Sequence, residues 1–520
     1  MKKGINLLLV VIFSIASIMG CSGGNTNSSG TSTNPTNTNP EATSKAEPVK
    51  EKLAISMVVP SYAGGGWPDN NHPTIKYLNE KFNIELDVQW IPGPNYNEKL
   101  NVLAASDNLP DIYRANPGSN LYEKWQGEGA FVELSSYIDN YPNLKNAFPE
   151  EYWKFLNPKD KIYGVPYGAP TNPTAFVVRK DWLDNVGLSV PNPDTFTIDE
   201  FYEIAKAFAL KDPDQNGKND TLGFSFGKFS GELPLRYAFG LSDGWMEIGG
   251  ELVPYIVQEA EMKEYLTFLN KAYKEGVLDK DFPINEGQAI NEKVSSGKLG
   301  LAIHIPIALL RNEAKVKEVQ PNAEFVQLAP PIGPTGIQLN DSVELLDKVV
   351  LNGKMDQAKV ERILEMMDWW VTDEGTDIIK NGPPNVFYKD NGDGTFTPTD
   401  EALSEGTRLA ILNNWVFRRI ANDHDVFKWD SQEYRERITS FFEMNEKYAA
   451  PLNPASGITF MSPTFAKKWT DLEKKYHQTV FKIIMGEAPL DSISGAIADW
   501  KKNGGDDIIK EINEAYQQMK

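Results

Sequence analysis

The sequence predicts an α/β fold in which a parallel sheet is covered by helices, because strand-type and helix-type apolar patterns alternate along the chain. Residues 53–59 form a short apolar run, and residues 84–90 alternate with the period of a strand buried on one face. Pro73 can begin a helix between these two segments. A helical stripe over 96–103 and a short strand from Pro110 follow, and ligands of such sheets bind at the carboxyl ends of the strands.

A second unit begins at the strand-like residues 175–178. Thr197 and Glu200 predict the capping box of an amphipathic helix in this unit. Near the end of the chain, two glycines at 504–505 separate two further helical stripes. Neither an internal repeat nor a second linker interrupts residues 51–520, so one continuous body with two lobes is expected.

The composition excludes several classes of protein. A length of 520 residues with 41% hydrophobic residues allows two or three domains with real cores. The single cysteine excludes an intramolecular disulfide scaffold and a multi-thiolate metal site, and the four histidines are far apart in sequence. A net charge of −20 argues against a nucleic-acid partner, because a phosphate backbone requires a basic face.

The N-terminal residues predict export. Two lysines precede an apolar run over residues 5–19, which is the pattern of a secretory signal and too short for a stable membrane span. The tetrapeptide that ends at Cys21 resembles the bacterial lipobox, which implies that residues 1–20 are a signal peptide and that Cys21 carries lipid such as palmitate. The alternative is a chance cysteine within a generic signal. We therefore expect an extracytoplasmic lipoprotein anchored to the cell membrane.

Residues 21–50 predict a flexible tether. Of the 29 residues from 22 to 50, 22 are Ser, Thr, Asn, Gly or Pro, so this segment cannot bury enough apolar surface to offset its ordering entropy. A coil of this length spans roughly 30 Å. The segment is expected to be a disordered linker between the lipid and the folded body.

Several segments, taken in order and spacing, resemble bacterial extracellular solute-binding proteins of ATP-driven importers (family 1, which includes maltose-binding proteins), and in particular the LipO-like lipoprotein subgroup. They are spread over nearly the whole body from about residue 53 to 518. The matching segments are Glu98-Lys99-Leu100-Asn101, Leu109-Pro110-Asp111-Ile112, Lys161-Ile162-Tyr163-Gly164-Val165-Pro166-Tyr167, Arg179-Lys180-Asp181-Trp182-Leu183, Thr372-Asp373-Glu374-Gly375, Ile483-Ile484-Met485-Gly486-Glu487, Trp500 and Gly504-Gly505.

This resemblance implies a two-lobed periplasmic-binding-protein-like fold of type II, as in maltose-binding proteins, with a cleft between the lobes. Each lobe is then discontinuous, because the chain crosses between lobes more than once. The first crossing is expected near residues 167–174, where prolines punctuate the chain. The expected N-terminal lobe comprises 51–169 with about 335–385, and the expected C-terminal lobe comprises 170–334 with about 386–520.

The segment 212–221 has the side-chain oxygens and the tight turn at Gly217 that match the first nine residues of a calcium-binding EF-hand loop. The match ends at position 12, where Gly223 replaces the EF-hand glutamate. The loop instead resembles that of alginate-binding relatives, with Thr221 after the last aspartate. A structural Ca²⁺ is predicted, and an Asx-rich turn is the alternative. The candidate ligands are Asp212, Asp214, Asn216, the carbonyl of Lys218, and Asp220.

Two other polar segments carry simpler predictions. Asn-Gly and Asp-Gly pairs within residues 390–394 predict a β-hairpin between two short strands. His424 lies between two aspartates, but no second ligand group is near in sequence, so a solvated loop is expected there.

Sugars are held by aromatic faces and by polar groups that bond their hydroxyls. Such residues are expected in loops that follow strands and at the expected hinge, and the alternative for each is an exposed aromatic or part of the core. The acidic charge favours a neutral oligosaccharide, while Arg114, Arg418 and Arg419 leave uronate oligomers open. The candidate ligand-binding residues are Trp67, Asp69, Asn70, Asn116, Tyr167, Asn172, Trp245 and Trp415.

The sequence favours a monomeric, non-enzymatic binding protein that delivers its solute to an importer permease. It contains no Gly-x-Ser-x-Gly, His-Glu-x-x-His, Walker or Gly-x-Gly-x-x-Gly motif, although carboxylate pairs among 72 acidic residues escape such inspection. A tethered carbohydrate-active enzyme and a binder that serves a membrane sensor are the alternatives.

Overall fold

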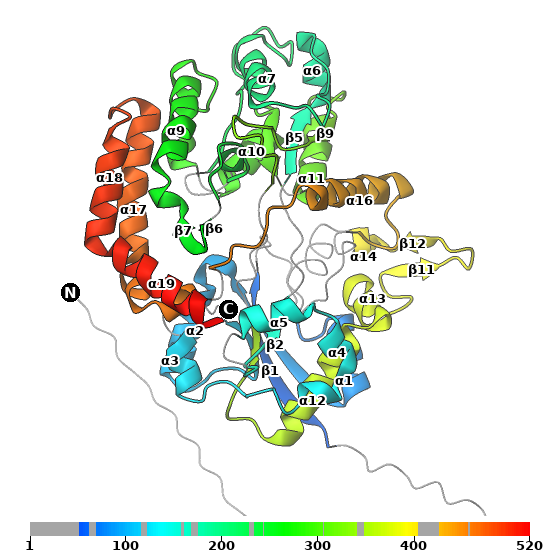
Figure 1. Cartoon of the computed structure of the whole chain (residues 1–520). Helices are drawn as coiled ribbons and strands as arrows, with labels where there is room; N and C mark the ends of the chain where they lie inside the picture. The colour runs from blue at the N-terminus through cyan, green and yellow to red at the C-terminus, as the bar shows by residue number, and fades with distance from the viewer. Residues whose placement is uncertain are drawn as a thin grey trace, which may run out of the picture. The chain divides into compact units, whose positions relative to one another are not determined.

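The computed structural model describes residues 51–61, 69–115, 122–157, 161–167, 175–227, 233–242, 244–285, 287–304, 306–340, 348–403, 426–455 and 458–519 (Figure 1). Glu51–Lys520 form one compact unit, separate from Met1–Lys50. The predicted signal peptide, Cys21 and the predicted linker lie outside the described residues.

The first lobe is built on a five-stranded sheet of order β2-β1-β3-β10-β4. β1 pairs in parallel with β2 and with β3, which confirms the predicted parallel arrangement. β10, far along the chain, inserts antiparallel between β3 and β4, and no local pattern predicted this position. The strands are β1 (Leu53–Ser61), β2 (Ile84–Pro92), β3 (Ile112–Ala115), β4 (Val165–Pro166) and β10 (Lys348–Leu351).

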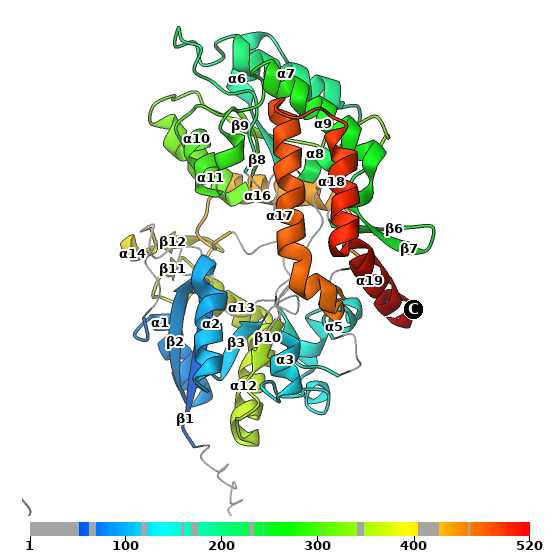
Figure 2. The same cartoon turned by 90° about the vertical axis from the view of Figure 1, so that its left-hand side faces the viewer.

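Both faces of this sheet are covered. Ile55, Met57 and Val59 of β1 join one hydrophobic cluster, and Val58 joins the cluster on the other face, as the two-residue period of a strand requires. Figure 2 shows α1 and α2 beside β2. The helices of this lobe are α1 (Pro73–Phe82), α2 (Tyr96–Ala105), α3 (Tyr122–Gly127), α4 (Pro142–Asn146), α5 (Glu150–Leu156), α12 (Gln357–Trp370), α13 (Asp373–Asn381) and α14 (Asp400–Leu403).

The predicted hairpin is confirmed. β11 (Tyr388–Asp390) pairs antiparallel with β12 (Phe396–Pro398) across the Asn-Gly and Asp-Gly turn. Just before it, Phe387 stacks on His72 at the start of α1, with the ring centroids 5.5 Å apart. This contact packs the start of the hairpin segment against α1 of the first lobe, and the assignment of residues from about 386 onward to the second lobe stays a prediction.

The second lobe is built on a three-stranded antiparallel sheet of order β8-β5-β9. Alternate residues of its central strand face two different hydrophobic clusters. The strands are β5 (Ala175–Arg179), β8 (Leu301–His304) and β9 (Phe325–Leu328), with a separate hairpin of β6 (Trp245–Ile248) and β7 (Glu251–Pro254).

Helices from two distant parts of the chain complete the second lobe. α17 packs alongside α9 and α18, as both views show (Figures 1 and 2). The predicted capping box at Thr197 is confirmed, since both of its hydrogen bonds are present at the start of α7. The helices are α6 (Lys180–Val186), α7 (Ile198–Leu210), α8 (Leu233–Ala238), α9 (Glu259–Lys274), α10 (Gly287–Ser295), α11 (Pro306–Lys317), α16 (Gln432–Lys447), α17 (Pro463–Met485), α18 (Ser492–Trp500) and α19 (Asp506–Met519).

The chain passes between the lobes at three places along the sequence. It leaves the first sheet after β4 and enters the second sheet at β5. It returns between β9 and β10, and it crosses again between α14 and α16. Each lobe is thus discontinuous in sequence, as in a two-lobed α/β binding-protein fold.

Candidate functional site

The carboxyl edge of the first sheet is the part of the molecule where a ligand is expected. The strand register places Ala115, the end of β3, opposite Lys348, and Lys348 opposite Pro166 of β4. Tyr96 of α2 fixes this edge, because its hydroxyl accepts a hydrogen bond from the backbone N–H of Arg114 at 2.8 Å. Three segments distant in sequence therefore meet at one edge.

Tyr167, predicted to bind solute, lies at this edge directly after β4. It is half-buried, and the guanidinium carbon of Arg114 lies 3.6 Å from the centroid of its ring. This stacking is a cation–π contact, and it places a positive charge beside an aromatic ring. The pair offers both of the contacts that an acidic saccharide requires, a ring surface and a cation.

Lys348 is a residue of this edge that the sequence did not single out. Its side chain is 2% exposed, its ammonium lies 3.2 Å from Asn157 Oδ1, and it lies 4.7 Å from the centroid of the Tyr122 ring. Burial lowers the pKa of Lys348 to about 7, because the charged form is poorly solvated there. In the sequence, the one indication that Lys348 is buried is its position directly before the apolar run Val-Val-Leu at 349–351.

Asp69 and Asn70, both predicted to bind solute, have local structural roles. Asn70 Oδ1 accepts a hydrogen bond from the backbone of Val88 at 3.0 Å, and Asn70 Nδ2 donates to Asp87 Oδ1 at 2.6 Å. Asp69 Oδ1 accepts from the backbone of Asn71 at 2.8 Å. These bonds tie the segment before α1 to β2, and solute binding by either residue stays a prediction.

Trp245 lies in the core of the second lobe, where its side chain is 3% exposed. The preceding Gly244 has φ 81°, and a Cβ there would lie 2.4 Å from Asn453 Nδ2, so the turn before Trp245 requires glycine. Four other predicted ligand residues lie outside the described residues: Trp67, Asn116, Asn172 and Trp415. The predicted loop at His424 lies outside them as well.

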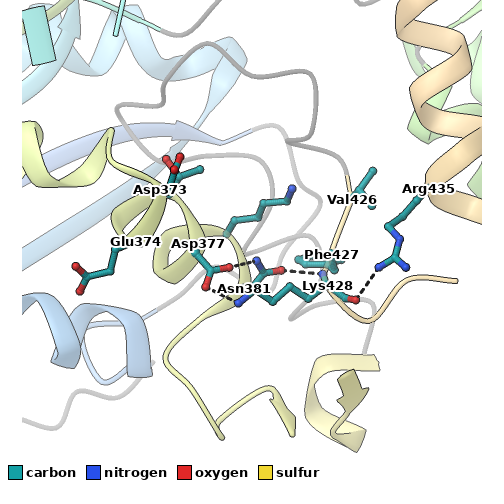
Figure 3. A pocket seen from close by; sticks show the side chains of 10 residues that line it. Asp373, Glu374, Asp377, Asn381, Val426, Phe427, Lys428 and Arg435 are labelled. Carbon is teal, nitrogen blue, oxygen red and sulfur yellow. Dashed lines mark hydrogen bonds and ion pairs between the residues drawn. The ribbon is translucent and has the colours of Figure 1, made fainter. Parts of the chain in front are cut away.

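A pocket of about 600 Å³ lies between α13 and residues 426–428 (Figure 3). Asp377 and Asn381 project from α13 toward Lys428, whose ammonium forms an ion pair with Asp377. Glu374, which also lines the pocket, pairs with Lys81 at 3.2 Å. The polar lining is thus largely engaged in contacts between protein groups.

The calcium-type loop folds as a tight turn after α7. Gly217 has φ 78°, and Asp212 accepts hydrogen bonds from the backbone of Asn216 and of Gly217, at 3.2 and 3.0 Å. The amide of Asn216 donates to Asp214 at 2.7 Å and to Asp220 at 3.0 Å. Within the described part of the chain, no group of three or more His, Cys, Asp or Glu side chains is placed to hold a metal ion.

One atom of this loop nevertheless fits a cation. Asp214 Oδ1 is buried and accepts no hydrogen bond from the described residues. Burial and the neighbouring carboxyl groups of Asp212 and Asp220 raise the pKa of Asp214. Thr221 does not face the loop, because its hydroxyl donates to the Phe208 carbonyl at 2.7 Å. The Thr221 hydroxyl is therefore not directed at the oxygens of the loop.

The chain belongs to the bacterial extracellular solute-binding proteins, since residues 68–336 match the profile of that family. Among curated relatives, "Lipoprotein LipO" of Bacillus subtilis is 28% identical over 87% of this chain and 90% of its own length. "Polygalacturonan/rhamnogalacturonan-binding protein YtcQ" of the same organism is 27% identical over 99% of both chains. The predicted family and LipO-like subgroup are thus confirmed, and the family consists of binding proteins, not enzymes.

Solved structures agree on the fold. The alginate-binding protein AlgQ2 without calcium ion matches with a TM-score of 0.67 at 20% identity, over 90% of this chain and 99% of that chain. The Streptococcus pneumoniae ABC-transporter substrate-binding protein FusA in complex with kestose also has a TM-score of 0.67, at 18% identity, over 89% and 99%. Within the described ranges, no helix is long and apolar enough to cross a membrane.

Proposed function

We propose that the chain is the membrane-anchored, solute-binding component of an ABC importer, that it captures an oligosaccharide between its lobes, and that it delivers the solute to a permease. The Arg114–Tyr167 pair at the carboxyl edge of the first sheet carries this proposal, because it joins an aromatic ring to a cation where ligands of such sheets bind. The names of YtcQ and FusA, which refer to polysaccharide and fructooligosaccharide solutes, support it.

The chemistry of the same pair favours a solute that carries carboxylates. A guanidinium bonds a carboxylate in bidentate fashion, whereas a neutral sugar gains only single hydrogen bonds from it. The net charge of −20 repels acidic solutes at long range, but salt screens this repulsion beyond about 8 Å, so the local cation decides. Oligogalacturonates are therefore the first solutes to test.

The test is thermal melting of residues 51–520 with trigalacturonate and with kestose, each compared with Arg114→Gln. A ligand at a hundredfold excess over its Kd stabilises by about 2.7 kcal/mol, which shifts the melting temperature by several degrees. We expect trigalacturonate to give the larger shift and Arg114→Gln to remove most of it. Unchanged melting with both sugars would contradict capture of these saccharides, and an equal shift in the variant would exclude a role for Arg114.

Anchoring through lipid on Cys21 is a separate part of the proposal. The sequence pattern of residues 18–21 supports it, together with the lipoprotein name of the LipO relative. We expect expressed full-length protein to partition into detergent and Cys21→Ser to appear in the aqueous phase. Equal partitioning of the two chains would contradict the anchor.

We further propose that the loop 212–221 binds a structural Ca²⁺ through the side chains of Asp212, Asp214, Asn216 and Asp220 and the carbonyl of Lys218. The buried Asp214 Oδ1 supports this proposal, because a cation would satisfy it. Calcium would add cross-links within the turn and supply no chemistry to solute binding. Chelator should lower the melting temperature of the wild type but not of Asp214→Asn, and identical melting of the wild type with and without calcium would contradict the site.

A further inference from the structure

The third crossing between the lobes contains two adjacent residues that are buried in different hydrophobic clusters. Val426, 8% exposed, packs with Ile438 and Phe441 of α16 in a cluster of the second lobe. Phe427, 1% exposed, packs with Phe387 beside the first lobe. Adjacent Cα atoms are only about 3.8 Å apart, so one peptide unit spans the boundary between the two clusters.

Lys428 fastens this segment to the first lobe through both its backbone and its side chain. Its backbone N–H donates to Asn381 Oδ1 at 3.1 Å, and its ammonium bonds Asp377 Oδ2 on the same helix, α13 (Figure 3). Asn381 Nδ2 in turn donates to Asp377 Oδ1 at 2.8 Å, which orients both acceptors. The network is partly buried, since the side chains of Lys428 and Asp377 are 27% and 32% exposed.

Aromatic packing holds the same residues from the other side. The ring of Phe427 stacks on Trp429 with the centroids 4.7 Å apart and an interplanar angle of 7°, and Trp429 stacks on Tyr388. Residues 427–429 are thus tied to α13 and to the hairpin segment of the first lobe. Toward the second lobe, Arg435 of α16 donates one hydrogen bond to the Lys428 carbonyl at 3.0 Å.

The pocket beside this segment leaves room for a change in geometry. It has a volume of about 600 Å³ and is lined by α13 on one side and by Val426 and Arg435 on the other. Well-packed clusters resist shear, whereas contacts across a cavity can lengthen or shorten without loss of packing. A rotation of α16 relative to α13 would therefore change this pocket before it changed either cluster.

We propose that Lys428 is a positioning residue for the closure of the lobes on solute, because it fixes residues 427–429 to α13 so that the rotation falls on the backbone on either side of them, between Val426 and Phe427 and between Trp429 and α16. This inference rests on the proposed function, in which the lobes close on a solute. Without the contacts of Lys428 with α13, residues 427–429 sample more conformations, so a smaller fraction of the protein is ready to close. The apparent Kd then rises by the inverse of that fraction.

The test compares Lys428→Met, Lys428→Arg and Asp377→Asn with the wild type, all as residues 51–520. The control is Lys206→Met, which removes an ion pair of similar exposure with Glu275 inside the second lobe, at 2.8 Å. The readouts are the Kd for trigalacturonate and kestose, and the hydrogen exchange of the 427–430 amides without solute. A structural role alone would change the melting temperature but neither of these readouts.

We expect Lys428→Met and Asp377→Asn to raise the Kd about tenfold and to speed exchange at 427–430 at least tenfold. Lys428→Arg should stay within threefold of the wild type, and Lys206→Met should not differ. Unchanged exchange and Kd in Lys428→Met would overturn the inference. If the wild type binds neither sugar, the proposed function fails, and the exchange measurement alone then decides whether Lys428 anchors the crossing.

Discussion

Lys348 at the edge of the first sheet and three ion pairs of the second lobe hold buried charge in different ways. In the second lobe, Arg179 pairs with Asp181, Lys293 with Asp279, and Arg437 with Glu313 at 2.8 Å. In the first lobe, Lys348 contacts only neutral groups among the described residues, an amide oxygen and a tyrosine ring. A paired buried charge recovers part of its desolvation cost, whereas a buried cation without a carboxylate partner destabilises the fold.

The largest expected effect concerns Glu313, which is 4% exposed. It accepts hydrogen bonds from both terminal nitrogens of Arg437, from Lys317, and from the Phe325 backbone at 3.0 Å. Glu313→Gln leaves the guanidinium without its partner and should lower the free energy of unfolding by about 3 kcal/mol. Urea denaturation at pH 7 measures this, and the surface variant Glu259→Gln is the control. If Glu313→Gln loses no more stability than Glu259→Gln, the buried Glu313–Arg437 pair contributes no more than a surface charge.

Glu313 also predicts a pH dependence. Burial opposes its charge, but the bonds from Arg437 and Lys317 outweigh burial and lower the pKa of Glu313 to about 2. Its stabilisation is therefore fully present above the pKa of an unfolded glutamate, about 4.3, and is lost as the pH falls from there to about 2. The Glu313→Gln variant should lack this part of the acid slope.

The next largest expected effect is the loss of stability at acidic pH that is caused by one buried histidine in each lobe. Burial lowers the pKa of His72 in the first lobe and of His477 in the second to about 4. The unfolded chain takes up these protons near pH 6.5, so each histidine costs stability as the pH falls from about 6.5 to 4, by about 3 kcal/mol. His477→Phe and His72→Asn should each flatten the melting temperature over this range. A slope unchanged in both variants would contradict this assignment.

The smallest effect concerns Lys348. Lys348→Met keeps the volume of the side chain and removes the buried ammonium, so we expect stability at pH 7 to stay equal or to rise by about 1 kcal/mol. Because its pKa is about 7 in the fold, the wild type should gain stability from pH 7 toward pH 10.5, while the variant should not. A loss of several kcal/mol in Lys348→Met would show that Asn157 and the Tyr122 ring compensate the buried charge fully.

The sequence predicted those elements whose formation depends on residues close together in the chain. The strands and helices from residue 53 to 115, the Thr197 capping box and the 390–394 hairpin follow from apolar spacing, side-chain caps and turn chemistry, and the structure contains them. The insertion of β10 between β3 and β4 depends on a pairing between distant segments, which no short pattern encodes. The antiparallel sheet around β5 has the same origin.

The candidate site was harder to predict for a related reason. Trp245 and Asn70 have residue types that suit a sugar site, but one lies in a core and the other bonds β2, and only three-dimensional neighbours decide this. Arg114 and Tyr167 lie more than fifty positions apart in the chain, and their contact arises because β10 brings β3 and β4 together. For the buried Lys348, the one indication in the sequence is its position at the start of an apolar strand.

The position of β10 has a consequence for biogenesis. A chain that is synthesised from its N-terminus presents β1, β2 and β3 long before Lys348–Leu351 emerge, so the edge of β3 lacks β10 as its partner during that interval. Unpaired strand edges are templates for aggregation. The first lobe therefore completes its sheet only after the whole second sheet, up to Leu328, has been synthesised, so the edge of β3 needs protection from other chains in that window.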